Sequence, residues 1–176
     1  MSKTSLKKEL KMLNEEQVKE MMLDLYTSCK EAREYLDFFV DPHVDELFDK
    51  HFNEIEKEAW RGKYGRSTAR ISRIRSTVRH FLSFDAGAEH DLLLMERTIC
   101  ELLKVTYRRY VSAPFENGII KLAADLLKYG ERQQVFDMAL AAYDRILRND
   151  YLTRSIRAEM TRQLEDFIAL ARPVKR

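Results

Sequence analysis

The sequence is short of the residues that turn or break a chain, with 5 glycines and 3 prolines among 176 residues. Sheet proteins need such residues every few positions, so their scarcity indicates long helices. The two cysteines, Cys29 and Cys100, have no spacing partner, which argues against a disulfide framework and favours a reducing compartment. No apolar run approaches the ~20 residues of a membrane span.

The beginning of the sequence is also unlike a secretory signal, because Glu9 and several lysines stand where an apolar core would lie. We therefore expect a cytoplasmic protein with no membrane partner. Apolar residues make up 45% and charged residues 34% of the chain, which is a globular composition. Its length predicts one all-helical domain, residues 1–176, with a possible sub-boundary near residues 85–90.

Apolar residues recur at three- and four-residue spacing, as they do along one face of a helix. Val18, Met22, Leu25 and Cys29 form one such stripe. The predicted helices cover about residues 5–13, 14–40, 42–60, 67–84, 88–111, 115–129, 131–147 and 151–171. Short connections make neighbouring helices antiparallel. The predicted fold class is all-α, with about eight antiparallel helices in hairpins that form a bundle or a short α-solenoid-like superhelix.

Local signals place several of the helix ends. Asn14 and Gln17 have the spacing of a capping box, in which each side chain bonds the other residue's backbone N–H. Ser67 is the expected N-cap of the helix over 67–84, and Gly130 the expected C-cap of the helix over 115–129. We also expect aromatic residues on both sides of residues 41 and 42 to pack together: Phe38, Phe39, Phe48 and Phe52.

Charge is unevenly distributed, although the net charge is only +2. Residues 1–60 carry 9 basic and 15 acidic side chains, whereas residues 61–110 carry 11 and 5. Segments of opposite charge attract each other within a fold or steer outside partners. The sequence does not decide between these two effects.

The segment 61–79 is the most unusual part of the chain, because it has seven basic residues and no acidic one. Six of the seven are arginines, which suit phosphate and bidentate carboxylate contacts. Tyr64 offers a ring on which a nucleic-acid base could stack, and the run from Tyr107 to Tyr110 could extend the patch. That run is also typical of a helix end, where cations favour the C-terminal dipole.

Three interpretations of the basic segment remain open. Its arginines pair with acidic residues of the preceding helix, such as Asp45, Asp49 or Glu56, or they bind phosphate or nucleic acid, or they bind an acidic protein partner. In the phosphate interpretation, backbone N–H groups near Ser67 and Thr68 form the free N-terminus of a helix. The candidate binding residues are Arg66, Ser67, Thr68, Arg70, Arg73 and Arg79.

Three stretches of the sequence resemble a known family: residues 13–18, residues 30–42 and residues 63–72. The family consists of uncharacterised, all-helical bacterial proteins, mainly from gut and environmental Bacteroidetes, and the resemblance covers about residues 5–84. It implies a bacterial, cytoplasmic, helical protein. It implies no activity, since none is assigned to that family.

Catalytic and metal-binding signatures are not found in the sequence. His51, Glu54 and Glu58 share one helical face, but the arrangement lacks the second Glu-x-x-His helix of a di-metal carboxylate bundle. Cys100 has no positioned base in its sequence neighbourhood. We therefore predict no catalytic residues, no metal and no cofactor. The first functional hypothesis is a non-enzymatic helical scaffold or protein-interaction module, and the alternative is nucleic-acid or phosphate-ligand binding through the basic helix 61–79.

Overall fold

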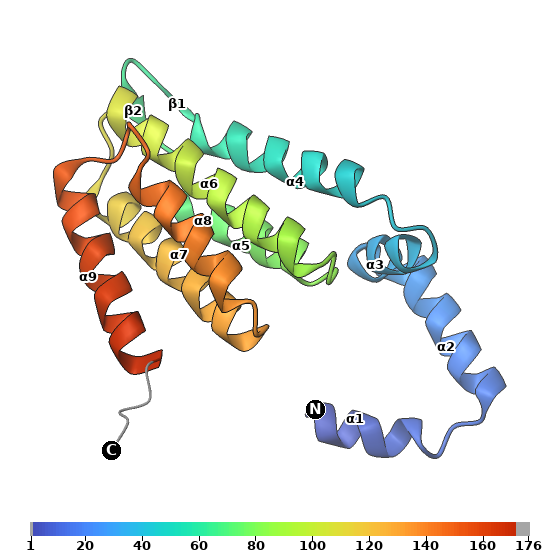
Figure 1. Cartoon of the computed structure of the whole chain (residues 1–176). Coiled ribbons are helices and arrows are strands. Elements are labelled where there is room, and N and C mark those ends of the chain that lie inside the picture. The colour runs from blue at the N-terminus through green and yellow to red at the C-terminus, as the bar shows by residue number, and fades with distance from the viewer. Residues whose placement is uncertain (1, 172–176) are drawn as a thin grey trace, which may run out of the picture. The chain divides into compact units, whose positions relative to one another are not determined.

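The all-helical prediction is confirmed by a computed structural model, which describes residues 2–171 without the side chains of residues 3, 170 and 171 (Figure 1). Helices account for 77% of it. The helices are α1 (Lys3–Leu10), α2 (Glu15–Ser28), α3 (Lys30–Val40), α4 (Val44–Ala59), α5 (Ile71–Leu82), α6 (Ala88–Arg108), α7 (Ala113–Arg132), α8 (Phe136–Leu147) and α9 (Arg154–Ala171). Two short strands, β1 (Gly62–Lys63) and β2 (Arg66–Ser67), form an antiparallel hairpin between α4 and α5.

The chain divides into two compact units, residues 1–43 and residues 44–176. The sequence predicted a single domain with a possible sub-boundary near residues 85–90. Residues 85–90 instead lie within the second unit, at the short connection from α5 to α6.

The first unit contains α1, α2 and α3. The predicted capping box is present, with Asn14 N–H donating to Gln17 Oε1 and Gln17 N–H donating to Asn14 Oδ1, each at 2.9 Å. The predicted single helix over 14–40 is interrupted at Cys29. The side chain of Arg33 donates to the carbonyl oxygens of Tyr26 and Thr27, so carbonyls at the end of α2 are satisfied without a further helical turn. No residue of α2 or α3 is buried.

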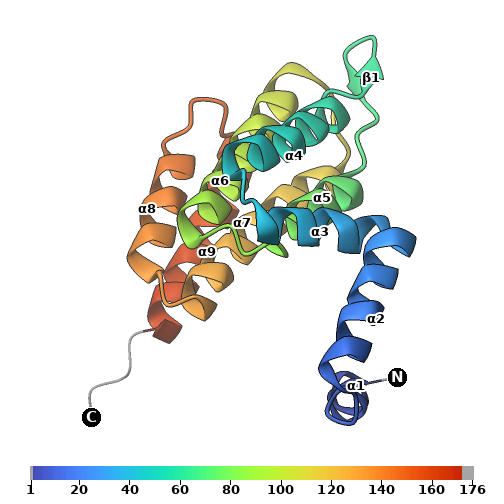
Figure 2. The ribbon, with the colours of Figure 1, turned by 90° about the vertical axis from the view of Figure 1, so that its right-hand side faces the viewer.

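The second unit is a stack of three helical hairpins: α4 with α5, α6 with α7, and α8 with α9 (Figures 1 and 2). Each helix also packs against the next helix but one, so α4, α6 and α8 form one row while α5, α7 and α9 form another. This two-row order is that of a short α-solenoid, one of the two predicted arrangements.

One hydrophobic core runs through the second unit. Its central helix, α6, is buried on more than one side, because it lies between α4 and α8 in its own row and against α7. Phe48 and Phe52 of α4 stack as expected, with ring centroids 6.2 Å apart. Phe38 and Phe39 belong to the first unit, so their expected packing against these two rings stays a prediction.

Gly130 is not the predicted C-cap but lies inside α7, which continues to Arg132. A Cβ atom at this position would collide with the Cβ of Ala139 on α8. The glycine therefore allows α7 and α8 to approach closely. The role of Gly130 is therefore in packing. The prediction of a C-cap considered only the neighbouring residues in the sequence and not the contact with α8.

Candidate functional site

Three of the six arginines of segment 61–79 converge on one carboxylate at the end of α4. Glu58 is 9% exposed, and its Oε1 accepts hydrogen bonds from the backbone N–H of Arg70 at 2.9 Å and from Arg70 Nε at 3.2 Å. Arg61 Nη1 lies 3.6 Å and Arg73 Nε 3.9 Å from the same carboxylate. Burial alone would raise the pKa of Glu58, but the hydrogen bonds from Arg70 and the nearby arginines lower it overall.

Pairing with the preceding helix, as predicted, therefore accounts for three of the seven basic residues, and a fourth, Arg75, pairs with Asp125 of α7. Asp45, Asp49 and Glu56 form no ion pair with these arginines among the described residues, and Glu58 is the acceptor. Glu58 lies four residues before Gly62, the first residue of the hairpin, and the chain reversal brings Arg70 back beside it. Helical spacing on α4 could not reveal this, since the contact depends on the hairpin.

The structure contradicts the predicted helix N-terminus at Ser67 and Thr68. The backbone N–H of Ser67 donates to Tyr110 O at 3.0 Å, and that of Thr68 donates to Arg61 O at 2.9 Å. Helix α5 begins at Ile71, with Arg70 as its N-cap residue. The N–H groups expected to bind an anion are thus used by the hairpin and its neighbours, and this version of the phosphate site is wrong.

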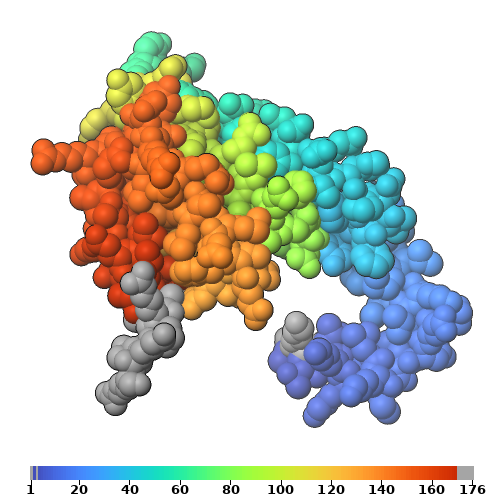
Figure 3. Space-filling model, viewed as in Figure 1, coloured from blue at the N-terminus to red at the C-terminus, as the bar shows by residue number. Residues whose placement is uncertain are grey.

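A second set of basic and aromatic residues lies on the hairpin and at the end of α6, which the contacts of Tyr110 join to the hairpin, and we call it the hairpin end. It consists of Lys63, Tyr64, Arg66, Tyr107, Arg108 and Tyr110. Three tyrosines are exposed here: Tyr64 fully, Tyr107 at 67% and Tyr110 at 70%. Neither contributing segment, 61–79 or 102–115, contains an acidic residue. Figure 3 shows the teal hairpin beside the yellow end of α6 on one side of the second unit.

Backbone and side-chain contacts hold the hairpin end in place. Tyr110 N–H donates to Gly65 O at 2.8 Å, and the guanidinium of Arg66 lies over the Tyr110 ring at 5.5 Å. At the base of the hairpin, the indole N–H of Trp60 donates to Glu101 Oε1 at 2.6 Å. Arg109 donates to Trp60 O at 2.6 Å. The exposed rings are therefore presented by an ordered support.

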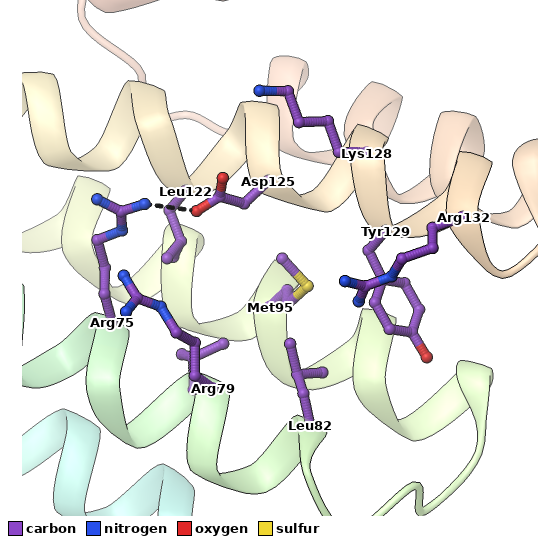
Figure 4. Close-up of a pocket in the computed structure, with 10 residues that line it drawn as sticks. Arg75, Arg79, Leu82, Met95, Leu122, Asp125, Lys128, Tyr129 and Arg132 are labelled. Carbon is purple, nitrogen blue, oxygen red and sulfur yellow. Dashed lines mark hydrogen bonds and ion pairs between the residues drawn. The ribbon is translucent and has the colours of Figure 1, made fainter. Parts of the chain in front are cut away.

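Arg79 is separated from the other predicted site residues and lines a pocket between α5 and α7 (Figure 4). Lys128 and Arg132 of α7 line the same pocket, and the sequence prediction missed both. The only local signal was their spacing of four residues, which places them on one helical face. Nothing in the sequence indicated that this face opposes Arg79.

The residues considered as metal ligands, His51 and Glu58, contact different partners, and Cys100 was considered as a nucleophile. His51 Nδ1 lies 2.8 Å from Leu47 O and its Nε2 lies 3.1 Å from His80 Nδ1, whereas Glu58 binds arginines. The described residues contain no group of three or more His, Cys, Asp or Glu side chains that could hold a metal ion. Burial raises the pKa of the Cys100 thiol, which favours the protonated, less nucleophilic form.

A family model matches residues 1–114, which is more than half of the chain, and its description is a family of unknown function, DUF6155. The chain belongs to this family. The DUF6155 match contains the whole hairpin end and the Glu58 cluster, and it ends in the first turn of α7. No curated protein and no solved structure matches the chain. Among the described residues, no helix is both long and apolar enough to cross a membrane.

Proposed function

We propose that this protein is a non-enzymatic interaction module that binds an acidic protein partner through the hairpin end. The observation that carries the proposal is the grouping of exposed Tyr64, Tyr107 and Tyr110 with cationic side chains, in two segments without an acidic residue. Tyrosine and arginine are the residue types that most often dominate the binding energy of protein interfaces. The positive charge of Lys63, Arg66 and Arg108 favours a partner surface rich in Asp and Glu.

The order of the hairpin end supports binding, since fewer side chains need to be fixed when a partner arrives. Arg66 already lies against Tyr110. Tyr64 has a left-handed backbone, with φ of +54°, a conformation that is costly for a residue other than glycine. The hairpin holds this ring fully in solvent, where it makes no contribution to the core.

Nucleic acid is a weaker candidate for the same surface. A protein that binds nucleic acid by its backbone contacts about six to ten phosphates, and it needs about one cationic side chain for each contact. The hairpin end offers three cations, because Arg61, Arg70 and Arg73 are engaged by Glu58. The net charge of the whole chain is only +2.

We also propose a bacterial origin and a cytoplasmic location. The resemblance of residues 5–84 to proteins of Bacteroidetes supports the first. The second is supported by the free state of Cys29 and Cys100, since unpaired thiols are usual in a reducing compartment.

The binding proposal is tested with labelled poly-L-glutamate and labelled oligothymidylate, titrated with the full chain at ~150 mM salt, where weak non-specific attraction is screened. We expect saturable binding to poly-L-glutamate that is weakened in Arg66→Gln and in Tyr64→Asn, which removes the ring but tolerates the left-handed backbone. Arg79→Gln, outside the hairpin end, is the control and should bind as the wild type does. Preferential binding of oligothymidylate, lost in the same variants, would replace the protein partner by single-stranded nucleic acid. Binding of neither probe would refute the proposal.

A further inference from the structure

A pocket of about 390 Å³ lies between α5 and α7, with a residue of α6 at its base. Its volume is within the range of about 300–1,000 Å³ that is usual for small-molecule sites. It belongs to the groove between two neighbouring helices of one solenoid row. The pocket does not include any residue of the hairpin end, so its function can be tested separately.

The pocket is strongly cationic. Arg75 and Arg79 line it from α5, and Lys128 and Arg132 line it from α7, whereas Asp125 is its one acidic residue. Asp125 is already used, because its Oδ2 accepts a hydrogen bond of 2.6 Å from Arg75 Nη2. Among the described residues, the other three cations have no carboxylate partner. Arg75 Nε is also buried without an acceptor there.

The base of the pocket is apolar. Val78 and Leu82 of α5, Met95 of α6 and Leu122 of α7 line it. Figure 4 shows Leu82 and Met95 between Arg79 on one side and Arg132 on the other, and the guanidinium of Arg132 lies over the Tyr129 ring, 5.7 Å from its centroid. The arrangement thus places two guanidinium groups around an apolar surface.

The next groove in the same row shows that this charge is not a general property of the fold. That groove, about 460 Å³ in volume, lies between α7 and α9. Its charged lining residues are Glu116, Lys121 and Glu159, so acidic side chains outnumber basic ones. Packing of the solenoid helices therefore creates both grooves. Only the groove between α5 and α7 is cationic, because of the side chains that these two helices contribute to it.

We propose that the α5–α7 pocket binds a small organic phosphate that has an apolar part. The phosphoryl group lies between Arg79 and Arg132, where charge-assisted hydrogen bonds from planar guanidinium groups match its oxygens. The apolar part lies on Leu82 and Met95. A doubly charged phosphate compensates the unpaired cations better than a single carboxylate does.

A small ligand fits this site better than a nucleic-acid chain. Nucleic-acid surfaces track a long backbone with a stripe of cations and offer exposed aromatic rings for stacking. Here the cations face each other across a concave site. The ring of Tyr129 is 4% exposed, and its hydroxyl donates to the buried Asp91 at 2.5 Å, so it offers no open stacking surface.

An alternative explanation is that the arginines merely cover the apolar base with their aliphatic stems while their charged groups stay in water. The two explanations differ in one measurable property. Side chains that only cover the base do not recognise phosphate, and their replacement leaves ligand affinity unchanged.

The experiment is calorimetric titration of the full chain with phenyl phosphate, with inorganic phosphate and phenol as separate probes for the two halves of the ligand. We expect phenyl phosphate to bind more tightly than either part. Arg79→Gln and Arg132→Gln should each weaken it about tenfold, as expected for loss of one charge-assisted contact. Both side chains are exposed, so the fold should persist, which circular dichroism checks. Arg154→Gln, at an exposed position in α9 outside both the pocket and the hairpin end, is the matched control and should leave affinity unchanged.

Four results would overturn the proposal. One is absence of phenyl phosphate binding at millimolar concentration, and a second is equal affinity in the wild type and both pocket variants. A third is equal affinity for inorganic phosphate, which would show an anion site without an apolar component. The fourth is displacement of phenyl phosphate by oligothymidylate in the wild type, which would assign the site to nucleic acid. Failure of poly-L-glutamate binding at the hairpin end has no bearing on any of these results.

Discussion

Removal of the Glu58 carboxylate tests whether this one side chain organises the basic segment. Glu58→Ala deletes the acceptor of two hydrogen bonds from Arg70, one of them from the backbone N–H at the start of α5. It also leaves the guanidinium groups of Arg61 and Arg73 without their carboxylate. We expect the second unit to lose stability and the hairpin to become less ordered.

The size of the loss follows from the exposure of the partners. A hydrogen bond to a charged group contributes about 1.5–3 kcal/mol, and an N-cap bond about 0.5–2 kcal/mol. The arginine side chains are 51–64% exposed, so water stabilises them after the carboxylate is removed and the ion pairs themselves contribute little. We therefore expect about 2 kcal/mol for Glu58→Ala, and about half of that for Glu58→Gln, which keeps an acceptor oxygen.

The assay is urea denaturation followed by the fluorescence of Trp60, the only tryptophan, which lies in the same unit beside the hairpin. Glu56→Ala is the matched control, because Glu56 is an exposed residue on the same helix. Its effect should stay within about 0.5 kcal/mol. Equal stabilities of the Glu58→Ala and Glu56→Ala proteins would refute the assignment.

The pH dependence provides a second check of Glu58. Its pKa is lower in the folded protein than its ordinary value of 4.5. A lowered pKa means that the carboxylate stabilises the fold fully above that ordinary value, and that this stabilisation is lost as the pH falls through the folded pKa. The stability difference between the wild type and Glu58→Ala should therefore be present at pH 7 and decrease in acid.

Two further predictions concern other buried positions. Burial raises the pKa of Asp91 from 3.8 to about 6, against the opposing effect of the Tyr129 hydroxyl, so its stabilising contribution is present below pH ~4 and lost as the pH rises through ~6. At pH 7, Asp91→Asn should therefore be more stable than the wild type by about 1–3 kcal/mol and should melt at a higher temperature. This difference should decrease in acid. A lower melting temperature of the variant at pH 7 would contradict the prediction. Gly130→Ala should destabilise the fold by about 1–3 kcal/mol in urea denaturation, despite the better helix propensity of alanine, because its Cβ meets Ala139. The double variant, Gly130→Ala with Ala139→Gly, should lose less stability than the sum of the losses in the two single variants. A loss equal to that sum would argue against the contact.

Local signals in the sequence predicted local features well. The capping box at Asn14 and Gln17 depends on residues three apart, and both of its hydrogen bonds are present. The apolar stripe of α4 was also predictable, because helical spacing alone places Phe48, Phe52 and Ile55 on one face.

Features that depend on distant segments could not be predicted in the same way. The start of α5 was misplaced because Ser67 bonds to Tyr110, more than forty residues later in the chain. The pocket could not be predicted because Arg79 and Arg132 lie on helices that are adjacent only after α6 has packed between α4 and α8. The choice of Glu58 over Glu56 as the arginine acceptor likewise depends on the hairpin geometry.

The absence of buried residues from α2 and α3 has a thermodynamic consequence. The heat-capacity change of unfolding and the denaturant m-value both scale with the surface that unfolding newly exposes to water. Melting of α2 and α3 exposes little new apolar surface, so almost all of both quantities comes from residues 44–171. Calorimetry of the full chain should therefore give a heat-capacity change below the ~12–15 cal/mol/K per residue that is usual for globular proteins.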